Sequence, residues 1–154
     1  MFENIDNLKL LGIIHGISAL YQIYTNRPSH VFIFKIDGES KYTFNDKIIH
    51  LSQGEMLFIS KGSSYTVELV SGNNSRYILI NFEADVLDAQ PKKYQLSNLT
   101  DFNHICSRLL EYTLLDADSD RYKCLSLFYE ILSYISSVKE PEYKSADTLS
   151  LIEP

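Results

Sequence analysis

The sequence predicts a mainly β fold followed by two helices. Short runs rich in Val, Ile, Phe, Tyr and Thr occupy residues 31–82, and turn residues such as Asp37-Gly38 separate them at near-regular spacing. This pattern is typical of a β-sandwich or β-barrel. The runs at 31–34 and 56–59 are apolar at consecutive positions, so we expect both faces of these strands to be covered. After residue 98 the hydrophobic period changes from two to 3.6, which indicates helices.

Length and composition restrict the classes of protein that fit. A chain of 154 residues with 45% hydrophobic residues suits one soluble domain with an appendage. The longest apolar run is far too short to span a bilayer, and no secretory-signal pattern is present, so we expect no membrane contact and a cytoplasmic location. The net charge is -6, and no block of Lys and Arg stands out. This chain is therefore not expected to bind nucleic acid itself.

The segment before the main group of strands is less regular. Residues 1–16 have no clear period, and they can form either an arm laid over the barrel or a first strand. Residues 18–25 have the pattern of a strand. Asn26-Arg27-Pro28 is expected to end that strand, because Pro28 has no N–H to give to a ladder of hydrogen bonds.

Six strands are predicted next, with sequences HVFIFKI, ESKYTF, KIIHL, EMLFIS, SYTVELV and RYILINF. Asp37-Gly38 and Asn45-Asp46 have the composition of two-residue hairpin turns. Residues 30–44 are therefore predicted to form one hairpin, and residues 41–51 the next. After Pro91, a last edge strand is expected at residues 93–96.

Two helices are predicted in the C-terminal part. The second, from about Asp120 to Lys139, has two apolar stripes, whereas one stripe is enough to pack a surface helix. One stripe is therefore expected to meet the barrel or the first helix, and the other a second copy of the chain; the alternative is that both are buried in the monomer. The predicted dimer interface consists of Leu125, Phe128, Leu132 and Ile135.

The residue types needed for catalysis or metal binding are dispersed. The histidines, His15, His30, His50 and His104, form no close pair, so we expect no metal site and no cofactor. The Gly-x-Ser-x-Gly elbow and the phosphate-binding glycine patterns are both missing. The sequence therefore indicates no catalytic residues.

Aromatic residues are the strongest remaining signal. The chain has eleven Tyr and eight Phe but no Trp, and many of them lie in the predicted strands. Tyr42, Tyr65 and Tyr77 each combine a flat apolar face with a hydroxyl, and Arg27 offers a planar set of donors. Any single tyrosine is better explained by a place in the core, but the set as a whole favours a small-molecule pocket.

Several of these segments resemble the N-terminal cupin-type domain of AraC-family transcription regulators. The matching segments are Asn26-Arg27-Pro28-Ser29-His30, Tyr42-x-Phe44, Leu51-x-x-Gly54-Glu55-Met56-Leu57-Phe58-Ile59, Lys61-Gly62-Ser63-Ser64-Tyr65 and Tyr77-Ile78-x-Ile80-Asn81-Phe82. The resemblance implies a cupin-like double-stranded β-barrel followed by two packed α-helices that form a dimer contact.

The resemblance also implies a division of the chain. Residues 1–98 would be the ligand-binding barrel, and residues 99–140 the two-helix dimerisation segment. Residues 141–154 would be a linker and the start of a missing DNA-binding domain, because Leu149 to Pro154 resemble the beginning of that domain's opening helix. DNA would then be bound only through the absent part.

Site residues follow from the same resemblance. In the arabinose-binding members, an arginine before a proline contacts the sugar, and Arg27 occupies that place. The residues expected to line the pocket with it and Tyr42 are Tyr65, Val67, Tyr77 and Leu79. A histidine usual at the position of Tyr65 is missing, and Val67 and Leu79 replace aromatic residues, so a sugar other than arabinose or another small metabolite is expected.

The sequence thus predicts the effector-sensing and dimerisation domain of a bacterial AraC-type regulator. Two alternatives stay open. One is a metal-free cupin enzyme, such as a sugar isomerase or epimerase. The other is a dimerisation domain with a filled core and no ligand.

Overall fold

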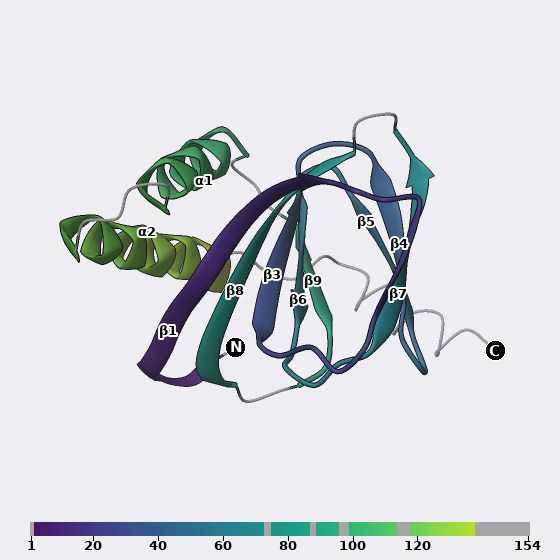
Figure 1. Cartoon of the computed structure of the whole chain (residues 1–154), viewed down its shortest axis with the longest axis horizontal. Helices are drawn as coiled ribbons and strands as arrows, with labels where there is room; N and C mark the ends of the chain where they lie inside the picture. Colours follow the sequence, from purple (N-terminus) through teal and green to yellow (C-terminus); the bar gives the residue numbers. More distant parts are fainter. Residues whose placement is uncertain (1, 73–74, 87–88, 96–98, 114–117, 138–154) are drawn as a thin grey trace.

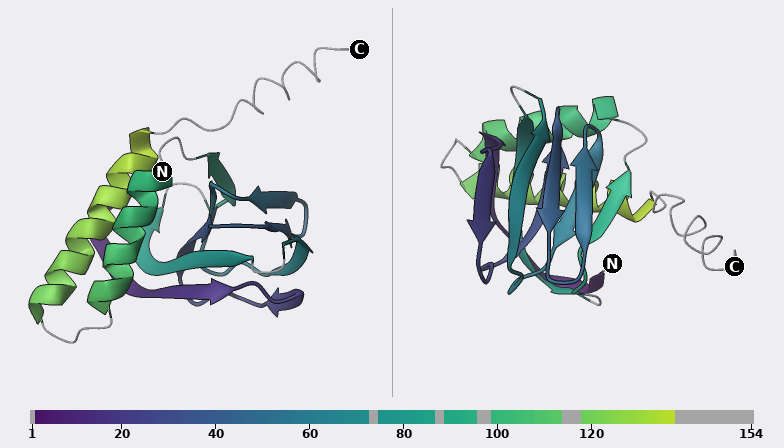
Figure 2. Two further views of the ribbon diagram at one scale, coloured as in Figure 1. Left: turned by 90° about the horizontal axis from the view of Figure 1, so that it is seen from above. Right: turned by 90° about the vertical axis from the view of Figure 1, so that its right-hand side faces the viewer.

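Two antiparallel β-sheets face each other, and two helices cover the outer face of the larger sheet (Figures 1 and 2). The computed structural model describes residues 2–72, 75–86, 89–95, 99–113 and 118–137. The expected linker and start of a DNA-binding domain, 141–154, lie outside these residues. Among the described helices, none is long and apolar enough to cross a membrane. The predicted mainly β fold with C-terminal helices is confirmed.

The five-stranded sheet has the spatial order β1 (Phe2–Ile17), β8 (Arg76–Val86), β3 (His30–Lys35), β6 (Glu55–Ile59) and β9 (Lys92–Gln95). The four-stranded sheet has the order β2 (Tyr21–Tyr24), β7 (Tyr65–Ser71), β4 (Glu39–Thr43) and β5 (Ile48–Ser52). The N-terminal segment therefore forms a strand, which is one of the two forms the sequence allowed. The predicted last edge strand is also present, as β9.

The predicted hairpin over residues 30–44 is wrong. Strand β3 pairs with β6 and β8, whereas β4 pairs with β5 and β7, so the Asp37-Gly38 turn carries the chain from one sheet to the other. The reason lies in burial. Nearly every residue of β3 is buried, and such a strand needs cover on both faces; β4 alternates between buried and partly exposed residues, as suits a sheet with one solvent face.

The second predicted hairpin is confirmed. Thr43 of β4 lies opposite Ile48 of β5, and the backbone N–H of Phe44 donates to the carbonyl of Lys47 at 2.8 Å. Asp37 still forms a tight turn, in which its carboxylate accepts from Nε of Arg76 at 2.9 Å. Gly38 is required there, because its φ is +74° and a Cβ would lie 2.5 Å from Oγ of Ser75.

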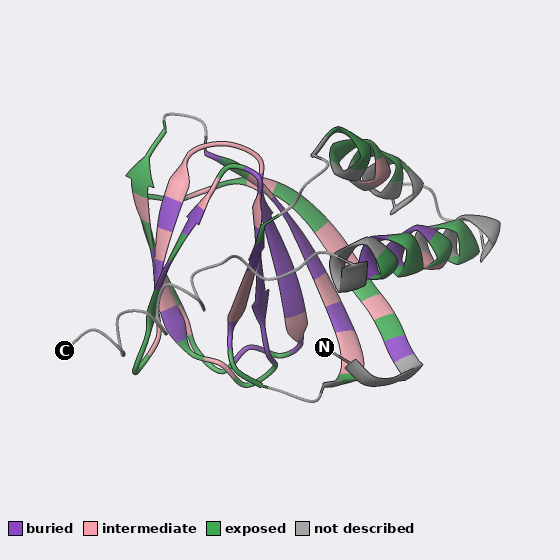
Figure 3. Ribbon diagram, turned by 180° about the vertical axis from the view of Figure 1, so that it is seen from behind, coloured by how far each residue is buried: buried purple, intermediate pink, exposed green. Residues whose placement is uncertain are grey.

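The helices α1 (Leu99–Thr113) and α2 (Asp118–Ser137) pack on the outer face of the five-stranded sheet. Residues of α2 that face the sheet are buried, and the opposite side of the helix is exposed (Figure 3). The phenylalanines of the sheet form the floor; the rings of Phe32 and Phe82 stack at 4.8 Å, and Phe82 lies 5.4 Å from Phe128. The buried residues of α2 are Leu127, Phe128, Ile131 and Leu132.

This packing bears on the predicted dimer interface. Phe128 and Leu132 are 0% and 6% exposed and belong to the core beneath α2. Leu125 is partly buried, and the side chain of Ile135 lies outside the described residues. The buried side of α2 combines Phe128 and Leu132, from the apolar stripe that includes the predicted interface, with Leu127 and Ile131, from the other stripe. A dimer through these helices stays a prediction, and the exposed side of α2 is the surface available to it.

Candidate functional site

The space between the two sheets is filled by every second residue of the strands. On β3, Val31 and Ile33 point between the sheets, while Phe32 and Phe34 point toward the helices, as the period of two requires. The inner core is formed by Val31, Ile33, Tyr42, Ile49, Leu51, Leu57, Ile59, Tyr65, Val67 and Leu79. It contains the buried tyrosines Tyr42 and Tyr65, whereas the helix-side core is mostly phenylalanine and aliphatic residues, with Tyr94 at its edge strand β9.

A cavity lies at one end of this inner core. About 20 Å³ of it is open to the centre of a water molecule, which is room for about one water. Five of the six residues predicted to bind a ligand line it; only Arg27 does not. The full lining consists of Ser18, Ala19, Gln22, Tyr24, Ile33, Tyr42, Tyr65, Val67, Tyr77 and Leu79.

Sequence reasoning missed the contribution of the segment around β2. Gln22 and Tyr24 are two residues apart on a strand and therefore share a face, which was the available signal. Ser18 and Ala19 come from the connection between β1 and β2, which has no periodic pattern. Gly16 leaves room for the Tyr77 ring at the cavity edge, since a Cβ there would lie 2.6 Å from the Tyr77 hydroxyl.

Arg27 lies behind the cavity wall. Its guanidinium donates to the hydroxyl of Tyr65 at 3.1 Å and to Oδ1 of Asn81 at 2.6 Å, and it lies 5.7 Å from the ring centre of Tyr24. The Arg27 backbone is held by the turn before β7, because its N–H donates to the carbonyl of Ser63 at 3.0 Å. Arg27 is 7% exposed, and its Nε has no hydrogen-bond partner among the residues that the structure describes. It positions Tyr65.

Burial affects the ionisation of three cavity tyrosines, Tyr24, Tyr42 and Tyr65. Burial raises the pKa of Tyr65 to about 12, although Arg27 acts in the opposite direction. Burial also raises the pKa of Tyr42 and, to a smaller degree, that of Tyr24. Among the described residues, the Tyr65 hydroxyl is hydrogen-bonded and those of Tyr24, Tyr42 and Tyr77 are not. Three lining hydroxyls are thus available to a water or a ligand.

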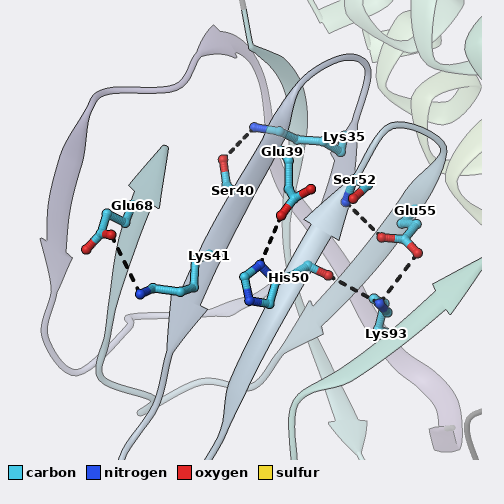
Figure 4. A network of polar contacts seen from close by, with 9 residues as sticks. All are labelled: Lys35, Glu39, Ser40, Lys41, His50, Ser52, Glu55, Glu68 and Lys93. Atoms are coloured by element: carbon cyan, nitrogen blue, oxygen red, sulfur yellow. Dashed lines mark hydrogen bonds and ion pairs between the residues drawn. The ribbon is translucent and has the colours of Figure 1, made fainter. Parts of the chain in front are cut away.

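Lys35 is the last residue of β3 and lies opposite Tyr77 of β8. Its ammonium is buried, with the residue 3% exposed, and it donates to Oγ of Ser18 at 2.8 Å and to Oγ of Ser40 at 2.7 Å. Figure 4 shows the contact with Ser40 beneath the four-stranded sheet. Burial lowers the pKa of Lys35 to about 8, and nearby Asp37 acts in the opposite direction.

Two of the histidines, His30 and His50, have structural partners. The ring of His30 contacts the carbonyl of Ala84 at 3.1 Å and accepts from the N–H of Lys61 at 2.9 Å, and burial lowers its pKa. His50 pairs with Glu39 on the exposed face of the four-stranded sheet (Figure 4). In the part of the chain that the structure describes, no three His, Cys, Asp or Glu residues are grouped so as to hold a metal ion. The tyrosine-lined cavity between the sheets is the candidate site for a small molecule.

Comparisons with known proteins place the chain among regulators. Residues 30–138 match the family described as the ExsA N-terminal regulatory domain. A comparison with curated proteins gave no match.

The chain shares its fold with one solved structure, ToxT, and is similar to parts of others. Apo ToxT K231A from Vibrio cholerae strain SCE256 is 8% identical, over 87% of this chain and 58% of that chain, with a TM-score of 0.51. YhaK from Escherichia coli is 19% identical, over 60% of this chain and 45% of that chain, with a TM-score of 0.48. A cupin-2 domain protein from Shewanella frigidimarina is 16% identical, over 51% and 72% of the two chains, with a TM-score of 0.34. The chain thus spans about half the length of ToxT and YhaK.

Proposed function

Because the chain belongs to the ExsA N-terminal regulatory domain family of AraC-type regulators, we propose that it senses a small-molecule effector between its two sheets. Family membership favours a regulatory role over a catalytic one. The observation that carries the proposal is the cavity wall, in which three tyrosine hydroxyls have no protein partner among the described residues. Aromatic walls with a few polar groups are the usual lining of small-molecule sites, including those for sugars. The setting would be cytoplasmic, with DNA bound by a domain outside this chain.

Ligand entry would require local movement. The cavity has room for about one water, so a metabolite must displace part of the wall. The segment over residues 18–24 is suited to this, because β2 has four residues, lies at a sheet edge and, among the described strands, pairs with β7 alone. Ala19 and Gln22 are lining residues that are also exposed. The effector would bind beneath this segment.

A thermal-shift screen of sugars and small metabolites tests the proposal. A ligand at a hundredfold over its Kd should add about 2.7 kcal/mol to the free energy of unfolding. Tyr24→Phe removes a lining hydroxyl and should weaken that ligand, whereas Tyr21→Phe removes an exposed hydroxyl on the same strand and serves as the matched control. The proposal fails if no compound in a broad panel stabilises the protein.

We also propose that α2 mediates dimerisation through its exposed side. Tyr122 and Tyr129 are 75% and 37% exposed and lie seven residues apart, so they share one side of the helix with the partly buried Leu125. Tyr122→Asp with Tyr129→Asp should shift the mass measured by light scattering from dimer toward monomer. Tyr21→Asp, which charges an exposed tyrosine on β2, should leave the mass unchanged. A monomeric wild type at high concentration would contradict the proposal.

One observation favours an alternative, a domain that acts through contacts between chains and binds no ligand. The inner core is nearly filled, and the cavity has room for about one water. The two experiments above separate the functions. Self-association without any stabilising ligand would favour the alternative, and ligand binding that Tyr24→Phe weakens would exclude it.

A further inference from the structure

Strand β1 is a long edge strand with one free side. It pairs with β8 on one side, and among the described strands nothing pairs with the other. It has 16 residues, whereas the edge strands β9, β2 and β5 have 4, 4 and 5. The backbone N–H and C=O groups along such an edge are a template for pairing with another chain, so proteins usually keep edges short or charged.

The opposite side of the sandwich has this protection and β1 lacks it. Beside β5 and β9, Nζ of Lys47 donates to the carbonyl of Pro91 at 3.3 Å, and Nζ of Lys93 donates to the carbonyl of His50 at 3.2 Å. The β1 segment over residues 10–17 contains no Asp, Glu, Lys or Arg. The two ends of the five-stranded sheet therefore differ in how well they resist pairing with another strand.

The free edge is also apolar and open. Leu11, Ile14 and Ile17 are 48%, 50% and 64% exposed. A Cβ added at Gly12 would meet nothing within 4 Å, so the space beside the strand is empty at this point. Single exposed apolar residues are common on protein surfaces, but three on one uncharged edge segment indicate a contact surface.

This edge lies next to the surface proposed above for dimerisation. Figures 1 and 2 show the beginning of α2 on the same side of the molecule as β1, and the two elements are in contact. The exposed side of α2 has two large exposed side chains among its described residues, Tyr122 and Tyr129. A buried tyrosine supplies about 150–250 Å², whereas each partner in a stable interface buries about 800 Å². A dimer therefore needs more surface than α2 offers.

We propose that a second copy of the chain covers this edge, its β1 lying antiparallel to the first β1, so that two five-stranded sheets join into one. The pairing uses residues 12–17, where β1 has no register shift against β8. A two-fold axis perpendicular to the sheet places a strand antiparallel to its own copy, so one segment serves both partners. The inference rests on the proposed dimerisation and names the surface that α2 does not supply.

Charge favours this place for a contact between two copies. Each chain has a net charge of -6, so two copies repel each other over most orientations. Pairing through residues 12–17 brings together segments without Asp, Glu, Lys or Arg, and no like charges meet there at neutral pH. Self-pairing therefore avoids the main electrostatic cost of association.

A matched pair of lysine substitutions tests the edge. Ile17 on β1 and Ile48 on β5 are 64% and 58% exposed, and both belong to edge strands. Ile17→Lys should raise the dimer Kd measured by sedimentation equilibrium at least about tenfold, since the charge enters the interface twice. Ile48→Lys makes the same change in net charge and should leave the Kd unchanged. Equal Kd values for the two variants would overturn the proposal.

Hydrogen exchange tests the same edge in the wild-type chain, without any substitution. Amides within residues 11–17 should exchange at least about tenfold more slowly at a concentration where the protein is dimeric than after dilution. Amides of β5 should exchange at the same rate in both samples. A dimer by light scattering whose residues 11–17 show no dependence on concentration would overturn the proposal. Circular dichroism checks the fold of each variant, and Leu11→Lys replaces Ile17→Lys if that variant is unfolded.

The results separate this inference from dimerisation through α2. A dimer that Tyr122→Asp with Tyr129→Asp dissociates, but that Ile17→Lys leaves intact, would keep the role of α2 and refute the pairing of β1. A dimer that Ile17→Lys dissociates and the tyrosine variant leaves intact would do the reverse. A wild type that is monomeric at high concentration would refute both.

Discussion

The two faces of the five-stranded sheet are made from alternate residues of the same strands, yet their chemistry differs. The helix side is packed with phenylalanine; Phe32, Phe58, Phe82 and Phe128 are at most 1% exposed, and their rings contact one another. The inner side contains tyrosines, two buried cations and a cavity. The comparison indicates that the helix-side face stabilises the fold, while the inner face accepts polar groups at a cost that the proposed binding function would explain.

The largest effect is expected on the helix-side face. Phe32→Ala should lower the free energy of unfolding by about 3 to 5 kcal/mol, because it leaves a cavity among closely packed rings. Urea denaturation followed by circular dichroism measures the change. Leu20→Ala, at a residue 79% exposed, is the control and should change it by less than about 0.5 kcal/mol. A small effect of Phe32→Ala would remove the distinction between the faces.

The second prediction concerns the buried ammonium and pH. The pKa of Lys35 is about 8 in the folded chain against 10.5 for a free lysine, so the unfolded chain binds more protons between these values. Stability should therefore rise from pH 8 to pH 10, by about 2 kcal/mol. Above pH 10 the buried tyrosines reverse the trend, since burial raises the pKa of Tyr42 and Tyr65 above that of unfolded tyrosine.

Lys35→Met should abolish the rise between pH 8 and pH 10. Lys41→Met, which removes an exposed lysine, should retain it. Denaturation midpoints across the pH range measure both. A wild-type midpoint that stays constant over this range would show that the ammonium is not desolvated, and the inner face would then differ less from an ordinary core.

Arg27→Lys tests the polar support behind the cavity wall. A lysine keeps the charge but cannot donate to Tyr65 and Asn81 together, so a cost of about 1 to 2 kcal/mol is expected. Arg76→Lys changes an exposed arginine paired with Asp37, and its cost should be smaller. Thermal unfolding of the two variants gives the comparison, and equal losses would contradict a buried supporting role for Arg27.

The smallest effect on stability is expected at the cavity itself. Tyr42→Phe removes a hydroxyl that has no hydrogen bond among the described residues, so the free energy of unfolding should change by less than about 0.5 kcal/mol. The same variant should weaken an effector found in the metabolite screen. A large loss of stability would mean that this hydroxyl serves the fold.

Much of the site could be predicted from the strand pattern. Tyr42, Val67 and Leu79 lie at inward positions of their strands, and the period of two places them on one face without any knowledge of pairing. The position of the Arg27 side chain was harder to predict, because a long side chain at this place can reach either the cavity or the residues behind its wall. The contact of Lys35 with Ser18 joins residues seventeen positions apart across a connection with no pattern, and no local signal indicates it.

By itself, the sequence determined the type of the elements from residue 18 onward, the two covered faces of β3 and β6, and the resemblance to a regulatory domain. Only the tertiary structure decided which strands pair, which side of α2 is buried, and which polar groups meet inside the sandwich. The physical reason is that the hydrophobic period reports the local conformation of a few residues, whereas strand pairing depends on which distant segments bury their apolar side chains together. The turn at Asp37-Gly38 shows the difference, since its local signal is that of a hairpin and the burial of β3 sends the chain to the other sheet.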